Sequence, residues 1–138
     1  GPMPETFARQ HRDRDGSYMN PDHLAAFSRQ LNALRENTLA TIRQAQNTLS
    51  ERTEPGDEAD RAQHEEDTRL ALRTVERETR LLRKIDAALR RIRDGEYGYC
   101  LESGEEIGLE RLRARPTAEY CTEVKVQMEE KEKHYGKR

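Results

Sequence analysis

Aromatic and large hydrophobic residues are scarce in this sequence of 138 residues. It contains no tryptophan, its aromatic residues make up 5%, and its hydrophobic residues make up 33%. Globular chains average roughly 45–50% apolar residues, although the apolar sets are defined slightly differently. Little of the chain can therefore lie in a broad core, and its length allows one compact domain or a small domain with an extension.

Long apolar runs and an excess of positive charge are also absent. No run approaches the roughly 18 residues that a membrane span requires, and no signal peptide is visible, so we expect a cytoplasmic protein without a membrane segment. Charged residues make up 38%, but 25 Lys and Arg residues stand against 27 Asp and Glu residues, which gives a formal net charge of −2. Binding to nucleic-acid phosphates needs a cationic stripe, so this balance argues against it.

Cysteine is scarce as well, since Cys100 and Cys121 are the only two. They open the segments CLES and CTEV, which have the spacing of two zinc knuckles whose second cysteine is replaced, by Ser103 and by Val124. A structural zinc site needs four ligands, mostly thiolate or imidazole, whereas serine is a poor ligand and valine is none. None of the four histidines falls in either segment. We therefore expect no zinc at positions 100, 103, 121 and 124.

Two interpretations of the cysteines remain open. Both thiols can be ordinary small core residues, which the cytoplasm would keep reduced. They can also form a disulfide or a redox-sensitive pair, provided that they lie close enough to bond.

Helical periodicity is what the sequence has in abundance. Asn20-Pro21-Asp22 supplies a residue suited to the N-cap, a proline suited to the first helical position and an acid placed for the helix dipole. Apolar residues then follow mostly at spacings of three and four, which predicts a helix with a narrow apolar seam. They are Leu24, Phe27, Leu31, Leu34, Leu39, Ile42 and Leu49.

The helical pattern stops before Pro55-Gly56 and resumes after it, until Gly95 ends the second run. That run consists of Leu72, Val75, Thr79, Leu82, Ile85, Leu89 and Ile92. Helices joined by a short connection become antiparallel neighbours. We therefore predict a mainly α fold with a long antiparallel coiled-coil hairpin over residues 20–94, whose acidic tip lies at residues 55–62.

The two ends of the chain differ from the hairpin. Residues 1–19 are polar and lack a period, so we expect a mobile arm, in which Gly1-Pro2 ahead of Met3 resembles the remnant of a cleaved tag. Residues 95–138 contain several glycines and then a predicted helix over about 118–134, which indicates a small globular head, similar to a degenerate zinc finger, and a C-terminal helix. A head this small is difficult to stabilise without a staple. We expect three residues to contribute to its packing: Val124, Val126 and Met128.

Together these motifs resemble the DksA/TraR family of transcription factors. The resemblance rests on the hairpin, on Asp57-x-x-Asp60-Arg61-Ala62 at the bend, and on the head motifs Tyr97-Gly98-Tyr99-Cys100, Gly104 to Gly108, Ala114-Arg115-Pro116-Thr117-Ala118 and Cys121. It runs from about Tyr18 to the C-terminus. It implies a bacterial protein that binds RNA polymerase, inserts its coiled coil through the secondary channel and acts with the alarmone ppGpp in the stringent response.

The resemblance also assigns residues. The tip acids and alanine of the family match Asp57, Asp60 and Ala62. The basic residues that contact ppGpp at the polymerase interface match Lys84, Arg115 and Lys125, with Arg77 and Leu81 on the same stretch of the second helix. Most members carry four zinc-binding cysteines, so Ser103 and Val124 make this chain similar to a cysteine-poor type that can replace the zinc-containing form.

Other interpretations of the same residues are available. Asp57 can simply cap the second helix while Asp60 interacts with its dipole, and the basic residues can be solvated charges. The seam suits a coiled-coil scaffold or dimerisation module, although the bend supplies a partner helix within the chain and favours a monomer. A zinc-finger nucleic-acid binder is disfavoured by the missing ligands. No nucleophile and base form a catalytic motif, so we expect neither an enzyme nor a protein that binds DNA sequences directly.

Overall fold

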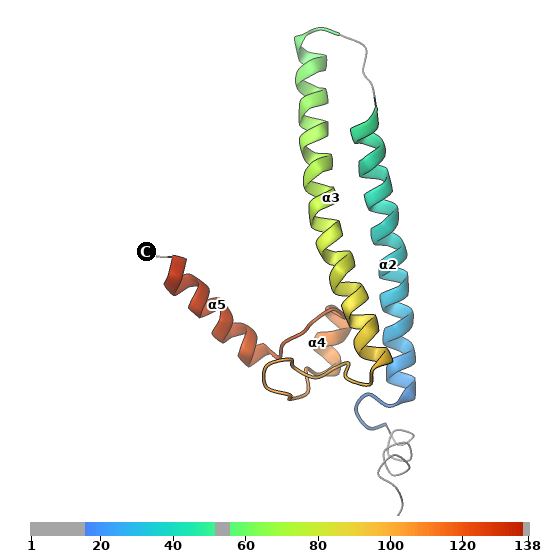
Figure 1. The fold of residues 1–138 in the computed structure, drawn as a ribbon, viewed down its shortest axis with the longest axis vertical. Helices are drawn as coiled ribbons and strands as arrows, with labels where there is room; N and C mark the ends of the chain where they lie inside the picture. The colour runs from blue at the N-terminus through green and yellow to red at the C-terminus, as the bar shows by residue number, and fades with distance from the viewer. Residues whose placement is uncertain (1–15, 52–55, 137–138) are drawn as a thin grey trace, which may run out of the picture. The chain divides into compact units, whose positions relative to one another are not determined.

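Helices account for most of the structure, which is a computed structural model that describes residues 16–51 and 56–136. Within these residues the four helices are α2 (Pro21–Ser50), α3 (Glu58–Arg93), α4 (Leu109–Ala114) and α5 (Thr122–Gly136) (Figure 1). Within the described residues there is no strand, only an isolated antiparallel bridge between Tyr99 and Glu106. The prediction of a mainly helical fold with a long hairpin and a C-terminal helix is confirmed. Most of the predicted N-terminal arm, and Pro55 of the predicted bend, lie outside the described residues.

The chain forms two compact units. One unit, here called the hairpin unit, contains residues 32–86. The other, here called the head unit, contains the described residues up to Leu31 together with those from Ala87 onward. The head unit therefore includes the first turns of α2 and the last turns of α3. No helix in the described ranges is long and apolar enough to cross a membrane.

The ends of the two long helices carry the signals that the sequence predicts. Asn20 caps α2, because its side-chain Oδ1 accepts a 2.8 Å hydrogen bond from the backbone N–H of His23. At the C-terminus of α3, the N–H of Glu96 donates to the carbonyl of Arg91 and the N–H of Gly95 donates to the carbonyl of Ile92. Gly95 has a φ of +76°, which a residue with a side chain rarely adopts. This arrangement is a Schellman motif, which ends α3 at the predicted position.

A series of buried and half-buried positions on each helix follows a spacing that alternates between three and four, as in a coiled coil. On α2 they are Leu24, Phe27, Leu31, Leu34, Thr38, Thr41, Ala45 and Thr48. On α3 they are His64, Thr68, Ala71, Val75, Glu78, Leu82, Ile85, Leu89 and Ile92. Other positions flank this series, among them the half-buried Leu39, Ile42 and Leu49 on α2 and the fully buried Ala88 on α3. The predicted seam was wrong at Leu72, which is 50% exposed while Ala71 is 7% exposed. The heptad register continues through the alanine, because burial follows position on the helix rather than side-chain size.

An aromatic and aliphatic cluster forms the core of the head unit. Leu31 and Leu112 are fully buried, and Tyr97 is 1% exposed. The rings of Phe27 and Tyr97 lie 5.5 Å apart between centroids, and the Tyr97 hydroxyl donates a 2.7 Å hydrogen bond to the carbonyl of Pro116. Within the head unit, Tyr97 therefore joins the first turns of α2 to the segment that follows α4.

The predicted contribution of the C-terminal helix to the head core was wrong for two of three residues. Val126 is 47% exposed and Met128 is 36% exposed, whereas Val124 is half-buried. The described side chains of α5 from position 126 onward are all exposed. The helix also begins at Thr122, later than predicted, because Thr117 and Ala118 lie buried in the loop before it. The head core is built instead from α4, the flanking loops and the adjoining turns of α2 and α3.

Candidate functional site

The hairpin tip presents two carboxylates with different roles in the structure. The side-chain Oδ1 of Asp57 accepts a 2.9 Å hydrogen bond from the N–H of Asp60, and the carbonyl of Asp57 accepts a 3.1 Å bond from the N–H of Arg61. Asp57 is therefore the N-cap of α3, which satisfies a backbone donor that the helix cannot. Asp60 lies in the first turn, at the positive end of the helix dipole.

Asp60 lies directly against Gly56. A Cβ placed on Gly56 would lie 2.6 Å from Oδ2 of Asp60 and 2.9 Å from its Cβ, which is closer than real Cβ contacts. The absence of a side chain at position 56 therefore leaves room for the Asp60 carboxylate in its observed position. Asp57, Asp60 and Ala62 are all exposed, so the three tip residues named by the family resemblance lie on the surface.

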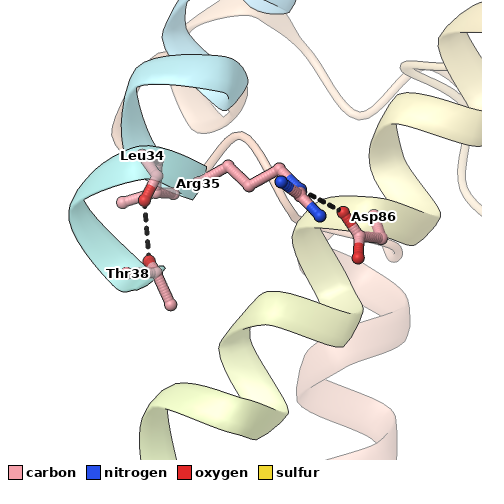
Figure 2. Close-up of polar contacts among 4 residues, drawn as sticks. All are labelled: Leu34, Arg35, Thr38 and Asp86. Atoms are coloured by element: carbon pink, nitrogen blue, oxygen red, sulfur yellow. Dashed lines mark hydrogen bonds and ion pairs between the residues drawn. The ribbon is translucent and has the colours of Figure 1, made fainter. Parts of the chain in front are cut away.

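An ion pair joins the two helices within the hairpin unit. Nε of Arg35 on α2 donates a 2.8 Å hydrogen bond to Oδ1 of Asp86 on α3 (Figure 2). This hydrogen bond to a carboxylate raises the pKa of Arg35 further. The sequence analysis missed the pair, although its signal was present: opposite charges directly beside the seam residues Leu34 and Ile85, where coiled coils place interhelical ion pairs.

The predicted basic residues fall in both units. In the hairpin unit, Arg77, Leu81 and Lys84 follow one another on α3 at spacings of four and three, so they share one face of the helix. Arg77 and Lys84 are exposed, and Arg77 lies 3.5 Å from the carboxylate of Glu78.

Arg115 and Lys125 belong to the head unit. Arg115 is exposed at the end of α4, where its N–H donates 2.8 Å to the carbonyl of Arg111. Lys125 is half-buried in the first turns of α5, and its N–H donates 3.0 Å to the carbonyl of Cys121. Both are therefore held by short helices or turns rather than by long loops.

The two buried cysteines form a cluster with Ser103, which is exposed. Cys100 is 3% exposed and Cys121 is 8% exposed, and both are free thiols. The Oγ of Ser103 lies 3.8 Å from Sγ of Cys121, and it also hydrogen-bonds Cys100. The serine hydroxyl therefore interacts with both thiols.

The surroundings of Cys100 favour its thiolate form. Burial raises the pKa of this thiol, but hydrogen bonds from the Ser103 hydroxyl and from the backbone of Cys121, Ser103 and Glu102 together lower the pKa to about 6. Backbone N–H groups that converge on a sulfur stabilise negative charge there. The turn that follows Cys100 is closed by the N–H of Gly104, which donates 2.8 Å to the carbonyl of Cys100.

The residues of this cluster do not fit a four-ligand zinc site. Two positions supply sulfur, Ser103 supplies a hydroxyl that already hydrogen-bonds the sulfurs, and Val124 supplies no donor atom. Within residues 16–51 and 56–136, no three His, Cys, Asp or Glu side chains are grouped as metal ligands. Packing of the buried Tyr97, Leu112 and Leu31 stabilises the head unit.

The hydroxyl of Tyr18, just before α2, hydrogen-bonds two segments of the head unit, which the sequence did not suggest. The Tyr18 hydroxyl donates a 2.5 Å hydrogen bond to the carbonyl of Gly98 and accepts a 3.0 Å bond from the N–H of Gly108. The Tyr18 and Tyr99 rings meet edge to face with centroids 5.6 Å apart. Burial raises the pKa of Tyr18, so its hydroxyl stays protonated and keeps its role as a donor. No sequence signal identifies this tyrosine, because the contact spans 80 residues or more.

Comparison with known proteins places these features in a family. Residues 23–92 match the family described as "DnaK suppressor protein DksA, N-terminal domain", and residues 95–125 match "Prokaryotic dksA/traR C4-type zinc finger". The chain is 46% identical over 120 residues to a protein of Caulobacter vibrioides called "RNA polymerase-binding transcription factor DksA", with 86% of this chain and 84% of the relative covered. The protein of the same name from Escherichia coli K12 is 40% identical over 120 residues, with 84% and 78% covered.

A solved structure is similar as well. The transcription factor DksA2 from Pseudomonas aeruginosa is 41% identical, with a TM-score of 0.76 over 91% of this chain and 99% of that chain. The chain described here belongs to the DksA family. The resemblance inferred from the tip, head and hairpin motifs is thereby confirmed, and since the family consists of non-enzymatic regulators, so is the prediction that the chain is not an enzyme.

Proposed function

We propose that this chain is a transcription regulator that binds RNA polymerase through its secondary channel and acts with ppGpp in the stringent response. The observation that supports this most directly is the exposed acidic tip: Asp57 caps α3, while Asp60 extends from its first turn with its side chain exposed. The names of the relatives, which call them RNA polymerase-binding transcription factors, support the same partner.

The tip acts on mobile protein elements near the polymerase active site. Its carboxylates alone do not make a magnesium site, because such sites need several oxygen ligands in fixed geometry. The negative charge of Asp60 is therefore the active feature, and Asp57 holds the helix start that presents it.

The basic residues contribute to ppGpp recognition at the polymerase interface. Lys84, Arg115 and Lys125 supply ammonium and guanidinium groups, which form charge-assisted hydrogen bonds with pyrophosphate oxygens. Arg77 and Leu81 share the face of α3 that carries Lys84. ppGpp is a co-regulator in the polymerase complex, and no DNA sequence is recognised directly.

The protein works without zinc and as a monomer. Ser103 and Val124 remove two of the four ligands of the zinc-containing form, and a buried core that includes Tyr97 and Leu112 supports the head. This regulator can therefore replace the zinc-containing form when zinc is short or thiols are oxidised.

Transcription in vitro from a ribosomal RNA promoter, with and without ppGpp, tests the proposal. The wild-type chain should repress the promoter more strongly with ppGpp, and Asp60→Asn should lose most of this effect while binding polymerase equally well. Full regulation by Asp60→Asn would refute the role of the tip acid.

A second pair of variants tests the basic residues. Arg115→Ala should weaken the response to ppGpp while leaving polymerase binding largely intact, and Arg113→Ala, an equally exposed arginine on α4, is the matched control. Equal loss of binding and ppGpp response would assign Arg115 to docking instead. The same assay with a zinc chelator, metal analysis and sedimentation at several concentrations tests zinc independence and the monomeric state.

A further inference from the structure

The hairpin unit is packed unevenly along its length. At one end, Leu34, Leu82 and Ile85 fill the seam, and Ile85 is fully buried. Toward the tip, the seam positions of α2 are Thr38, Thr41, Ala45 and Thr48, and those of α3 are His64, Thr68, Ala71 and Val75. We call residues 38–50 and 58–75 the outer hairpin. Alanine and threonine bury less apolar area than leucine or isoleucine, so the outer hairpin gains less from helix pairing.

The threonine hydroxyls on the α2 side of the outer hairpin do not strengthen the pairing. Oγ1 of Thr38 donates 2.7 Å to the carbonyl of Leu34 (Figure 2), that of Thr41 donates 2.9 Å to Asn37, and that of Thr48 donates 3.4 Å to Gln44. All three bonds remain within α2. A hydroxyl that bonds back to the preceding turn slightly destabilises or bends its helix.

Ion pairs between the described parts of the two helices are also confined to the well-packed end of the hairpin unit. The pair between Arg35 and Asp86 joins the helices at the well-packed end of the unit. Among the described residues between these two, the ion pairs lie within α3 and connect Glu66 with Arg69 and Arg77 with Glu78. Beyond Arg35 and Asp86, no ion pair of the described residues therefore resists separation of the two helices.

A groove runs beside the seam of the outer hairpin. It encloses about 400 Å³, and its lining includes Thr41, Ala45, Thr48, Ala71 and Thr74. The neighbouring Leu70 also lines it but remains 48% exposed. Space that side chains leave open removes van der Waals contacts from the atoms around it. The groove is thus the direct result of small residues at the seam.

We propose that the outer hairpin opens locally, in an equilibrium separate from the unfolding of the rest of the molecule. Isolated helices of about 12–15 residues are marginal in water. Each helical segment of the outer hairpin therefore depends on pairing with the other, and the small side chains of the seam stabilise this pairing only weakly. Regions with few buried apolar contacts open at lower free energy than the global transition. The Leu34, Leu82 and Ile85 layer, with the Arg35–Asp86 pair, marks where this opening stops. The well-packed end of the hairpin unit stays closed while the outer hairpin opens.

Hydrogen exchange of the full chain, resolved by peptide, tests this proposal. Amides of residues 41–50 and 63–75 should exchange about tenfold or more faster than those of residues 82–92, at a pH where exchange follows local opening. Equal protection along the whole of α3 would overturn the proposal.

A seam-filling variant gives a second, independent readout. Thr41→Leu/Thr48→Leu places larger apolar side chains at two half-buried positions that line the groove, and should slow outer-hairpin exchange by about tenfold without changing residues 82–92. Asn37→Leu/Asn47→Leu is the control, because both asparagines are exposed on α2 and the change in helix propensity is similar.

Equal slowing by both double variants would attribute the effect to helix propensity and overturn the role of the seam. If the Leu variant fails to fold, shown by loss of protection in the head unit, the wild-type exchange gradient alone decides the proposal.

Discussion

The carboxylate of Asp57 accepts a hydrogen bond from the backbone N–H of Asp60, so one tip acid fixes the position of the other. Substitution of Asp57 therefore removes the N-cap of α3, whereas substitution of Asp60 leaves this cap in place. Asp57→Ala should lower the free energy of unfolding by about 1 kcal/mol, because one N-terminal donor of α3 loses its acceptor. Urea unfolding followed by circular dichroism measures this change.

Asp57→Asn is the matched control for this prediction, since asparagine caps as well as aspartate. It should retain nearly the full stability. A loss as large as that of the alanine variant would show that charge, rather than the cap, stabilises the start of α3.

The buried hydroxyl of Tyr97 provides a second prediction. Tyr97→Phe leaves the carbonyl of Pro116 without its donor in a buried site and should cost about 1–3 kcal/mol of unfolding free energy. Tyr135→Phe, at a tyrosine that is 67% exposed, should change the stability by less than about 0.5 kcal/mol. Similar values for both variants in chemical unfolding would contradict the role assigned to this hydrogen bond.

The depressed pKa of Cys100 leads to a prediction about pH. The thiolate absorbance of the native protein should show a transition near pH 6, and Ser103→Ala should move it upward, because it removes one of the hydrogen bonds that lower the pKa. Cys121→Ser helps to assign the transition to Cys100. A single transition near pH 8.5 in the wild type would refute the assignment.

The same shift makes stability depend on pH. The folded pKa of Cys100 lies below that of an unfolded cysteine, so the thiolate stabilises the fold fully above about pH 8.5 and this contribution is lost as the pH falls through about 6. Cys100→Ser should therefore flatten the pH dependence of the unfolding midpoint between these limits. An unchanged profile would show that other groups cause the dependence.

Restoring the missing ligands tests how the head is held. Ser103→Cys/Val124→Cys should bind one zinc ion per chain, measured by metal analysis after dialysis, because four thiolates then occupy the knuckle positions. Each single variant, with three thiols, should bind zinc more weakly. Failure of the double variant to retain zinc would show that this head no longer allows the four positions to converge.

Patterns that repeat locally were the ones the sequence predicted well. The cap at Asn20, the stop at Gly95 and the cap at Asp57 each depend on contacts over a few residues, so their signals lie side by side in the sequence. The seam was predicted less well, because apolar residues were taken as its markers while the heptad register selects Ala71 and Thr38 over larger neighbours.

Contacts between segments distant in the sequence could not be predicted. The Cys100 thiol meets the backbone of Cys121 only after the intervening segment with α4 has folded, and Arg35 meets Asp86 only in one register of the hairpin. The exposure of Val126 and Met128 could not be predicted either, since it depends on α4 and the loops filling the head before α5 begins.

Tyr18 sets a practical boundary for shortened forms of this protein. Its ring precedes α2, yet its hydroxyl hydrogen-bonds the carbonyl of Gly98 and the N–H of Gly108, the N-cap residue of α4. A truncation that begins at Asn20 would keep the four helices of the described residues and still leave the carbonyl of Gly98 and the N–H of Gly108 without their shared partner. Shortened forms of the protein should therefore begin before Tyr18, so that this residue is kept.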